Sequence, residues 1–197
     1  VLLGVRSSKH VFMPHMYVFP GGRVDAGDAR VPSPVALRPE VEAKLTRSVS
    51  SARARALAMT AVRETFEETG LLLGHRSSVP LRTSSVHWKP FFELGLAPAL
   101  DKLDYVARAI TPPNNLRRFD ARFFLVDARH VSGDLAGNGE LEDLRWVDLK
   151  ETHRLALSPI TELVLGLLSD RLTGGKTDKN NIPFYRELAG KELIEYE

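Results

Sequence analysis

The sequence predicts a mixed α/β fold, and three observations support this expectation. Apolar runs that alternate with polar residues or end at turns indicate strands at residues 1–6, 105–111 and 121–128. Two longer segments with good helix formers and capping residues indicate helices at 52–69 and 159–172. The order strand, helix, strands, helix is typical of a chain that packs helices against a sheet.

Turn and capping residues define the elements of the first half. Residues 16–19 are expected to form a short strand that enters a tight turn at the following glycine pair. A proline opens a short helix over 39–47, because the N–H that proline lacks has no partner in a first turn. Ser51 is the expected N-cap of the long helix, and Gly70 is its expected C-cap.

The second half is expected to contain more strands and a second long helix. Residues 71–74 and 144–149 are predicted strands, and Trp146 is predicted to lie in the core. A helix interrupted by a proline is expected over 91–103, and residues 75–90 are predicted to be loop. Ser158 is the expected N-cap of the second long helix. Residues 182–197 are predicted to form a hairpin that turns at 189–190.

The composition excludes several classes of protein. The chain has 197 residues, which fits one domain over 1–197, and its 43% hydrophobic and 26% charged residues differ from those of disordered proteins. It has no cysteine, which excludes disulfides, thiolate zinc sites and cysteine nucleophiles. The net charge of +2 is too small to predict a nucleic-acid partner, and no apolar run reaches the roughly 18–20 residues of a membrane span. We therefore expect a cytoplasmic protein with neither nucleic-acid nor membrane partners.

Three glutamates lie on one face of the first long predicted helix. At about 100° per residue, Glu64, Glu67 and Glu68 fall within an arc of about 100°. Their mutual repulsion and their place near the helix C-terminus cost on the order of 1–3 kcal/mol. Either a solvated surface with nearby arginines absorbs this cost, or a hard divalent cation does. Oxygen ligands favour Mg²⁺ or Mn²⁺ over zinc.

The glycine turn FPGG is the second candidate element. The pair Gly21-Gly22 allows the backbone to approach a ligand closely, and the Gly22 carbonyl can serve as a metal ligand. Taken alone, such a pair indicates an ordinary hairpin turn. Its combination with the acidic helix is much more specific.

Together, these two segments resemble the motif of the Nudix hydrolase family. The chain has Gly22, then five residues, then Asp28, and later the run Arg63-Glu64-Thr65-Phe66-Glu67-Glu68-Thr69-Gly70-Leu71. Three features depart from the family pattern. Asp28 stands where the family has glutamate, Thr65 replaces an aliphatic residue, and residues 29–62 occupy a gap that usually holds seven residues. We assign the insertion to 29–57.

The resemblance implies an α/β/α sandwich around a mixed sheet and a metal-dependent diphosphatase. Its substrate would be a small molecule in which a nucleoside diphosphate is linked to another moiety. One to three Mg²⁺ or Mn²⁺ ions would be held by Glu64, Glu67, Glu68 and the Gly22 carbonyl. Arg63 would orient a neighbouring glutamate, and Glu64 or Glu140 would accept a proton. Phosphate would be bound by Arg6, Arg118 and Arg122.

The flanking segments resemble the Nudix branch that includes animal peroxisomal coenzyme A diphosphatases. This likeness implies coenzyme A or an acyl-CoA as the substrate. An ADP-ribose or NADH diphosphatase is the alternative enzyme, and a non-catalytic ligand sensor with the same fold is the alternative from another class. The insertion at 29–57 either forms a lid that selects the leaving group or packs on the outside. The C-terminal hairpin leaves a homodimer open as an assembly.

Overall fold

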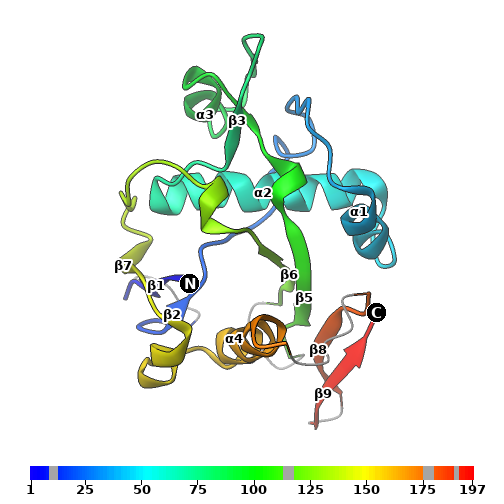
Figure 1. Cartoon of the computed structure of the whole chain (residues 1–197), viewed down its shortest axis with the longest axis vertical. Coiled ribbons are helices and arrows are strands. Elements are labelled where there is room, and N and C mark those ends of the chain that lie inside the picture. Colours follow the sequence, from blue (N-terminus) through cyan, green and yellow to red (C-terminus); the bar gives the residue numbers. More distant parts are fainter. Residues whose placement is uncertain (9–12, 113–117, 175–179, 189–190) are drawn as a thin grey trace. The chain divides into compact units, whose positions relative to one another are not determined.

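A computed structural model describes residues 1–8, 13–112, 118–174, 180–188 and 191–197 (Figure 1). These residues form two compact units, each built from separate stretches of the chain. Unit 1 comprises Val1–Phe19, Tyr105–Phe123 and Glu140–Glu197, and unit 2 comprises Pro20–Asp104 and Phe124–Gly139. The predicted glycine turn and glutamate helix both belong to unit 2. In the described ranges, no helix is both long and apolar enough to cross a bilayer.

The main element of unit 2 is helix α2, Ser51–Thr69 (Figure 1). Its N-cap is Ser50, one residue before the predicted Ser51, because the extended Ser50 accepts a hydrogen bond from the Arg53 N–H at 3.3 Å. The C-cap is Gly70, as predicted, with a left-handed φ of 73° that favours glycine. One face of α2 is fully buried, including Ala58 and Val62.

The predicted short helix in the insertion is present as α1, Pro39–Leu45. It packs against α2 and buries Val41 and Leu45. The last part of the insertion, from Ser51 onward, forms the first turns of α2 itself. The insertion therefore lengthens the glutamate helix at its N-terminal end and adds a second helix beside it.

The prediction of a helix over 91–103 is wrong for most of that segment. Helix α3 spans Lys89–Glu93 and is followed by strand β4, Leu96–Pro98, and the short 3₁₀ helix η1, Leu100–Lys102. Gly95 has a left-handed φ of 71° and ends the helical path. Strand β4 then pairs antiparallel with β3, Gly74–Arg76, so long-range pairing replaces the local helix preference. Of the predicted strand 71–74, Leu72 makes an isolated bridge with Ser132.

Unit 1 contains a three-stranded antiparallel sheet and helix α4. The strand order is β2 (Tyr17–Val18), β1 (Leu2–Arg6) and β7 (Leu141–Trp146). Strand β7 begins earlier than predicted, and Trp146 is 52% exposed, which corrects its assignment to the core. Helix α4 spans Pro159–Leu172, and Ser158 caps it as predicted by accepting a hydrogen bond from the Thr161 N–H.

A second sheet has the order β6 (Asp120–Leu125), β5 (Asp104–Ile110), β8 (Pro183–Leu188) and β9 (Lys191–Tyr196). Strands β5 and β8 are parallel, whereas β8 and β9 form the predicted antiparallel hairpin. The predicted turn at 189–190 lies outside the described residues. Two further 3₁₀ helices are η2, Ala128–His130, and η3, Leu149–Arg154. This sheet contains both parallel and antiparallel strand pairs, as expected for the mixed sheet that the resemblance implies.

Candidate active site

Asp28 is a charged residue of unit 2 whose side chain is fully buried. Arg63 donates two hydrogen bonds to the Asp28 carboxylate, from Nε to Oδ1 at 2.9 Å and from Nη2 to Oδ2 at 3.0 Å. The indole Nε1 of Trp88 donates to Oδ1 at 2.8 Å. The Thr60 hydroxyl and the Asp25 N–H donate to Oδ2, both at 2.8 Å. Because five donors fill its lone-pair directions, this carboxylate supports the site through Arg63 and is not itself available to a cation.

Asp28 and Arg63 form a buried ion pair. Burial alone would raise the pKa of Asp28, but the hydrogen bonds from Arg63 and Trp88 outweigh it and hold the pKa below its ordinary value of 3.8. Burial would likewise lower the pKa of Arg63, yet the hydrogen bond to Asp28 and the charge of Glu64 raise it above its ordinary value. Both groups are therefore charged at neutral pH. Their role is to hold neighbouring side chains in position, and they do not act as an acid or a base.

From this buried pair, Arg63 reaches two of the three glutamates. Its Nη1 lies 2.8 Å from Oε1 of Glu64 and 2.6 Å from Oε2 of Glu67. Its Nη2 also donates to the Arg23 carbonyl at 2.9 Å, which ties the loop after the glycine turn to the helix. The guanidinium is 5% exposed. Arg63 thus orients both carboxylates from a position that water hardly reaches.

The glycine turn lies directly against the glutamate helix. The Gly21 N–H donates to Oε2 of Glu68 at 2.8 Å. A Cβ atom placed on Gly22 would lie 2.3 Å from Oε1 of Glu64, which is far inside contact distance. Any side chain larger than that of glycine at this position would displace the Glu64 carboxylate. The two segments that the sequence singles out are brought together in one cluster.

The chemistry of this cluster fits a hard divalent cation. Four carboxylates, those of Asp28, Glu64, Glu67 and Glu68, surround the single guanidinium of Arg63 or border the adjoining turn. Within the part of the chain that the structure describes, no three histidine, aspartate or glutamate side chains are gathered as a ready metal-binding group. In this structure, the carboxylates of Glu64, Glu67 and Glu68 contact Arg63 or the Gly21 N–H. The excess of negative charge and the exclusively oxygen donors are the properties that favour Mg²⁺ or Mn²⁺.

The other four predicted site residues belong to unit 1. Arg122 has a side chain that is 4% exposed and forms an ion pair with Asp120 at 2.7 Å, so its charge is already engaged inside the protein. Arg118 and Glu140 are exposed, and Arg6 is half-buried in β1. Their roles in phosphate binding and proton transfer stay predictions.

Three side chains of the site are not among the residues predicted from sequence. Thr60 and Trp88 bind Asp28, and Nδ1 of His87 lies 2.8 Å from Oε1 of Glu67. The last two come from the end of a segment, 75–90, whose polar composition predicts a loop. The sequence signal for these residues was Trp88 itself, a large aromatic residue at the end of a polar segment. In the structure, its ring packs edge-to-face on Phe91 with a centroid distance of 5.6 Å.

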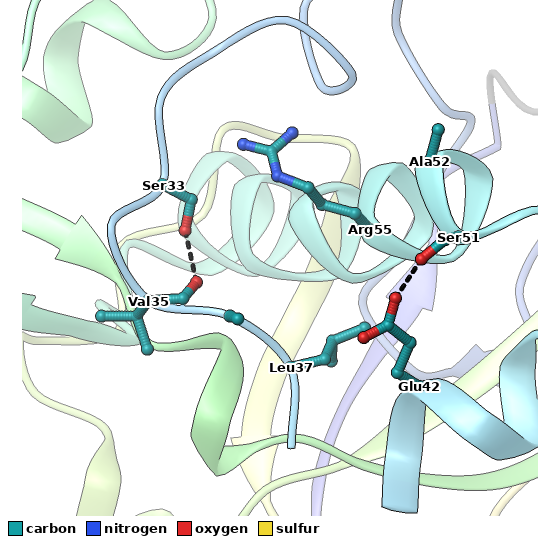
Figure 2. A pocket seen from close by; sticks show the side chains of 8 residues that line it. Ser33, Val35, Leu37, Glu42, Ser51, Ala52 and Arg55 are labelled. Carbon is teal, nitrogen blue, oxygen red and sulfur yellow. Dashed lines mark hydrogen bonds between the residues drawn. The ribbon is translucent and has the colours of Figure 1, made fainter. Parts of the chain in front are cut away.

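A separate pocket of about 310 Å³ lies in the insertion, between its first part and the start of α2 (Figure 2). It is lined by Ser33, Val35, Ala36, Leu37, Glu42, Ser51, Ala52 and Arg55. Glu42 and Ser51 bond each other across it. Arg55 donates to the carbonyls of Ala29 and Val31 and so fastens the insertion to the glutamate helix. The insertion is an integral part of unit 2, and its role as a lid stays a prediction.

Comparison with known proteins identifies the fold. No family model matches the chain, and no curated protein does. The crystal structure of a Nudix hydrolase from Alicyclobacillus acidocaldarius is similar to this chain, with a TM-score of 0.63 and 28% identity. The similarity covers 86% of this chain and 83% of that one. The chain has the Nudix hydrolase fold.

This fold confirms the predicted α/β class and supports an enzyme, a hydrolase of the pyrophosphatase type. A long insertion separates the two halves of the motif that the sequence predicts. The insertion begins directly after Asp28 and ends within α2, before Arg63, and these two residues still form the buried ion pair. The two halves of the predicted motif are therefore separated in sequence but in contact in space.

The close contact at Gly22 leads to a testable prediction. Gly22→Ala should reduce kcat by about 10-fold or more, because the new methyl group would displace the Glu64 carboxylate from the turn. Stability should change little, since the displaced atoms are the far end of a flexible side chain. Steady-state kinetics and thermal unfolding measure the two effects.

Gly166→Ala is the matched control for this variant. Gly166 lies inside α4, and a Cβ atom added there would meet open space, so alanine should stabilise the helix by about 0.5–1 kcal/mol without changing kcat. If Gly22→Ala retains full activity, the proximity of this turn to Glu64 has no functional importance.

Proposed function

We propose that the chain is a Mg²⁺- or Mn²⁺-dependent hydrolase that cleaves the diphosphate of a nucleoside diphosphate linked to another moiety. The observation that carries this proposal is the cluster in which Glu64, Glu67 and Glu68 lie around Arg63 and the glycine turn. A surface acidic helix has no need of a buried arginine–aspartate pair behind it. The Nudix fold supports the reaction class.

In this proposal, each residue of the cluster has a defined task. Glu64, Glu67 and Glu68 would hold the cation together with the Gly22 carbonyl. Its charge would neutralise the diphosphate and lower the pKa of a bound water. Arg63 keeps Glu64 and Glu67 in place, and Asp28 in turn keeps Arg63 in place.

Glu64 and Glu140 are the two candidates for the proton acceptor. Glu64 lies at the glycine turn with a side chain that is 12% exposed, where a carboxylate can remove a proton from a water beside the turn. Glu140 is an exposed residue of unit 1. If Glu140 is the acceptor, Glu140→Gln will reduce kcat by about 10²–10⁴-fold; if Glu64 is the acceptor, Glu140→Gln will keep a near-native kcat.

For the substrate, we propose coenzyme A or an acyl-CoA, with 3′,5′-ADP and a phosphopantetheine as products. This choice is supported by the sequence likeness of the flanking segments to the coenzyme A branch. A panel of coenzyme A, ADP-ribose, NADH and dinucleoside polyphosphates, assayed with Mn²⁺, tests it. Turnover of ADP-ribose without turnover of coenzyme A would favour the alternative enzyme. Binding of a panel member without any product would indicate a ligand sensor.

The proposed cation should stabilise the folded chain. Ligand bound to the native state alone adds about 2.7 kcal/mol at a concentration 100 times its dissociation constant, so Mn²⁺ should raise the melting temperature by several degrees. The shift should be much smaller for Glu68→Gln, which removes one of the charges. Thermal unfolding with and without Mn²⁺ measures both. An unchanged melting temperature for the native sequence would argue for a purely structural acidic helix.

A further inference from the structure

We propose that His87 is a positioning residue that holds Glu67 in the cation-binding arrangement, and that the neighbouring Trp88 fixes His87 in place. The inference rests on the proposed metal-dependent function. It adds to that function a residue outside the glycine turn and the glutamate helix. His87 and Trp88 lie in the turn that precedes α3, a segment distant in sequence from both.

Trp88 provides a rigid anchor for this turn. It is fully buried, and its Nε1 donates to Oδ1 of Asp28 at 2.8 Å. Its ring packs against Phe91 and Phe92 with centroid distances of 5.6 and 5.7 Å. Its backbone N–H bonds to the Ser85 carbonyl at 3.2 Å, which closes the turn. With Trp88 held on both its ring and its backbone, the preceding residue has little freedom to move.

His87 uses this fixed position to reach Glu67. Its Nδ1 donates to Oε1 of Glu67 at 2.8 Å, while Arg63 holds Oε2 at 2.6 Å. Donors on both oxygens determine the orientation of a side chain that otherwise has three rotatable bonds. Each oxygen retains a second lone pair for a cation. Arg63 divides its donors between Asp28, Glu64 and Glu67, whereas His87 directs Nδ1 at Glu67 alone among the contacts in the described residues.

His87 can be replaced without disturbing the packed core. Its side chain is 50% exposed, in contrast to the buried Trp88. A loss of function in a His87 variant can therefore be separated from a loss of folding by thermal unfolding. Asparagine places an amide donor close to the position of Nδ1, whereas glutamine places it farther along the side chain.

The test measures the affinity for Mn²⁺ alone, by electron paramagnetic resonance of the free ion, with the full chain. His87→Ala should weaken Mn²⁺ binding about 5- to 10-fold, which lies within the range for the loss of one typical hydrogen bond. His87→Asn should stay within about 2-fold of the native sequence. His87→Gln should resemble His87→Ala. All three should keep the native melting temperature in the absence of metal.

A double-mutant cycle tests whether His87 acts through Glu67. In a Glu67→Ala background, His87→Ala should have no further effect on Mn²⁺ affinity. The proposal is overturned if His87→Ala binds Mn²⁺ as well as the native sequence or more tightly, if asparagine fails to rescue, or if the two substitutions add. Absence of Mn²⁺ binding by the native sequence would instead overturn the proposed function and this inference together.

Discussion

Asp28→Asn is expected to lower the free energy of unfolding by about 3–5 kcal/mol, the usual cost of removing one partner from a buried ion pair. The amide would turn a donor toward Arg63 and Trp88, both of which are donors themselves. It would also leave the buried guanidinium of Arg63 without the negative charge of Asp28 beside it. Urea unfolding followed by circular dichroism measures this change, and the m-value shows whether unfolding remains two-state.

Asp170→Asn is the matched control for this substitution. Asp170 is exposed near the end of α4, so its charge contributes little, and the change should stay within about 0.5 kcal/mol. Equal effects of the two substitutions would show that the five hydrogen bonds of Asp28 contribute no special stability.

The Asp28 pair also makes stability depend on pH. The pKa of Asp28 is lower in the folded chain than its ordinary value of 3.8, so the folded state binds this proton less readily than the unfolded state. The resulting stabilisation is fully present above the ordinary pKa and is lost as the pH falls toward the folded pKa. The stability difference between the native sequence and Asp28→Asn should therefore shrink below about pH 4. A difference that is constant from about pH 3 to about pH 7 would contradict this origin.

Glu64→Gln is expected to reduce kcat by about 10²–10⁴-fold, the range for losing a positioned acid–base group. The carboxylate contacts Arg63 and borders Gly22, so its charge serves both the arrangement of the site and the proposed proton transfer. The free energy of unfolding should change by less than about 1 kcal/mol, because the lost ion pair is offset by relief of the repulsion from Glu67 and Glu68. Kinetics with a saturating substrate and thermal unfolding measure the two quantities.

Glu93→Gln provides the comparison at an exposed position of α3. Its carboxylate forms a solvent-exposed pair with Lys89 at 3.8 Å, which contributes little to stability. Both kcat and stability should match those of the native sequence. If Glu64→Gln retains near-native turnover, the glutamate cluster is not the catalytic centre.

The sequence predicted the elements that depend on local signals. The Gly70 C-cap, the Ser158 N-cap and the alternation of β5 are confirmed because each depends on residues within a few positions of one another. The segment around β4 was wrongly predicted because its helix preference is overridden by pairing with β3. Trp146 is predicted to lie in the core, but the structure leaves it 52% exposed.

The approach of the glycine turn to the acidic helix could be anticipated from the motif, even across the insertion. By itself, the sequence determined the acidic face of α2, because helical periodicity is a local property. Only the tertiary structure decided that Asp28 is buried and binds Arg63. It also decided that Trp88 contacts Asp28 and that His87 contacts Glu67. Those contacts join segments far apart in the chain, and no spacing along a single element encodes them.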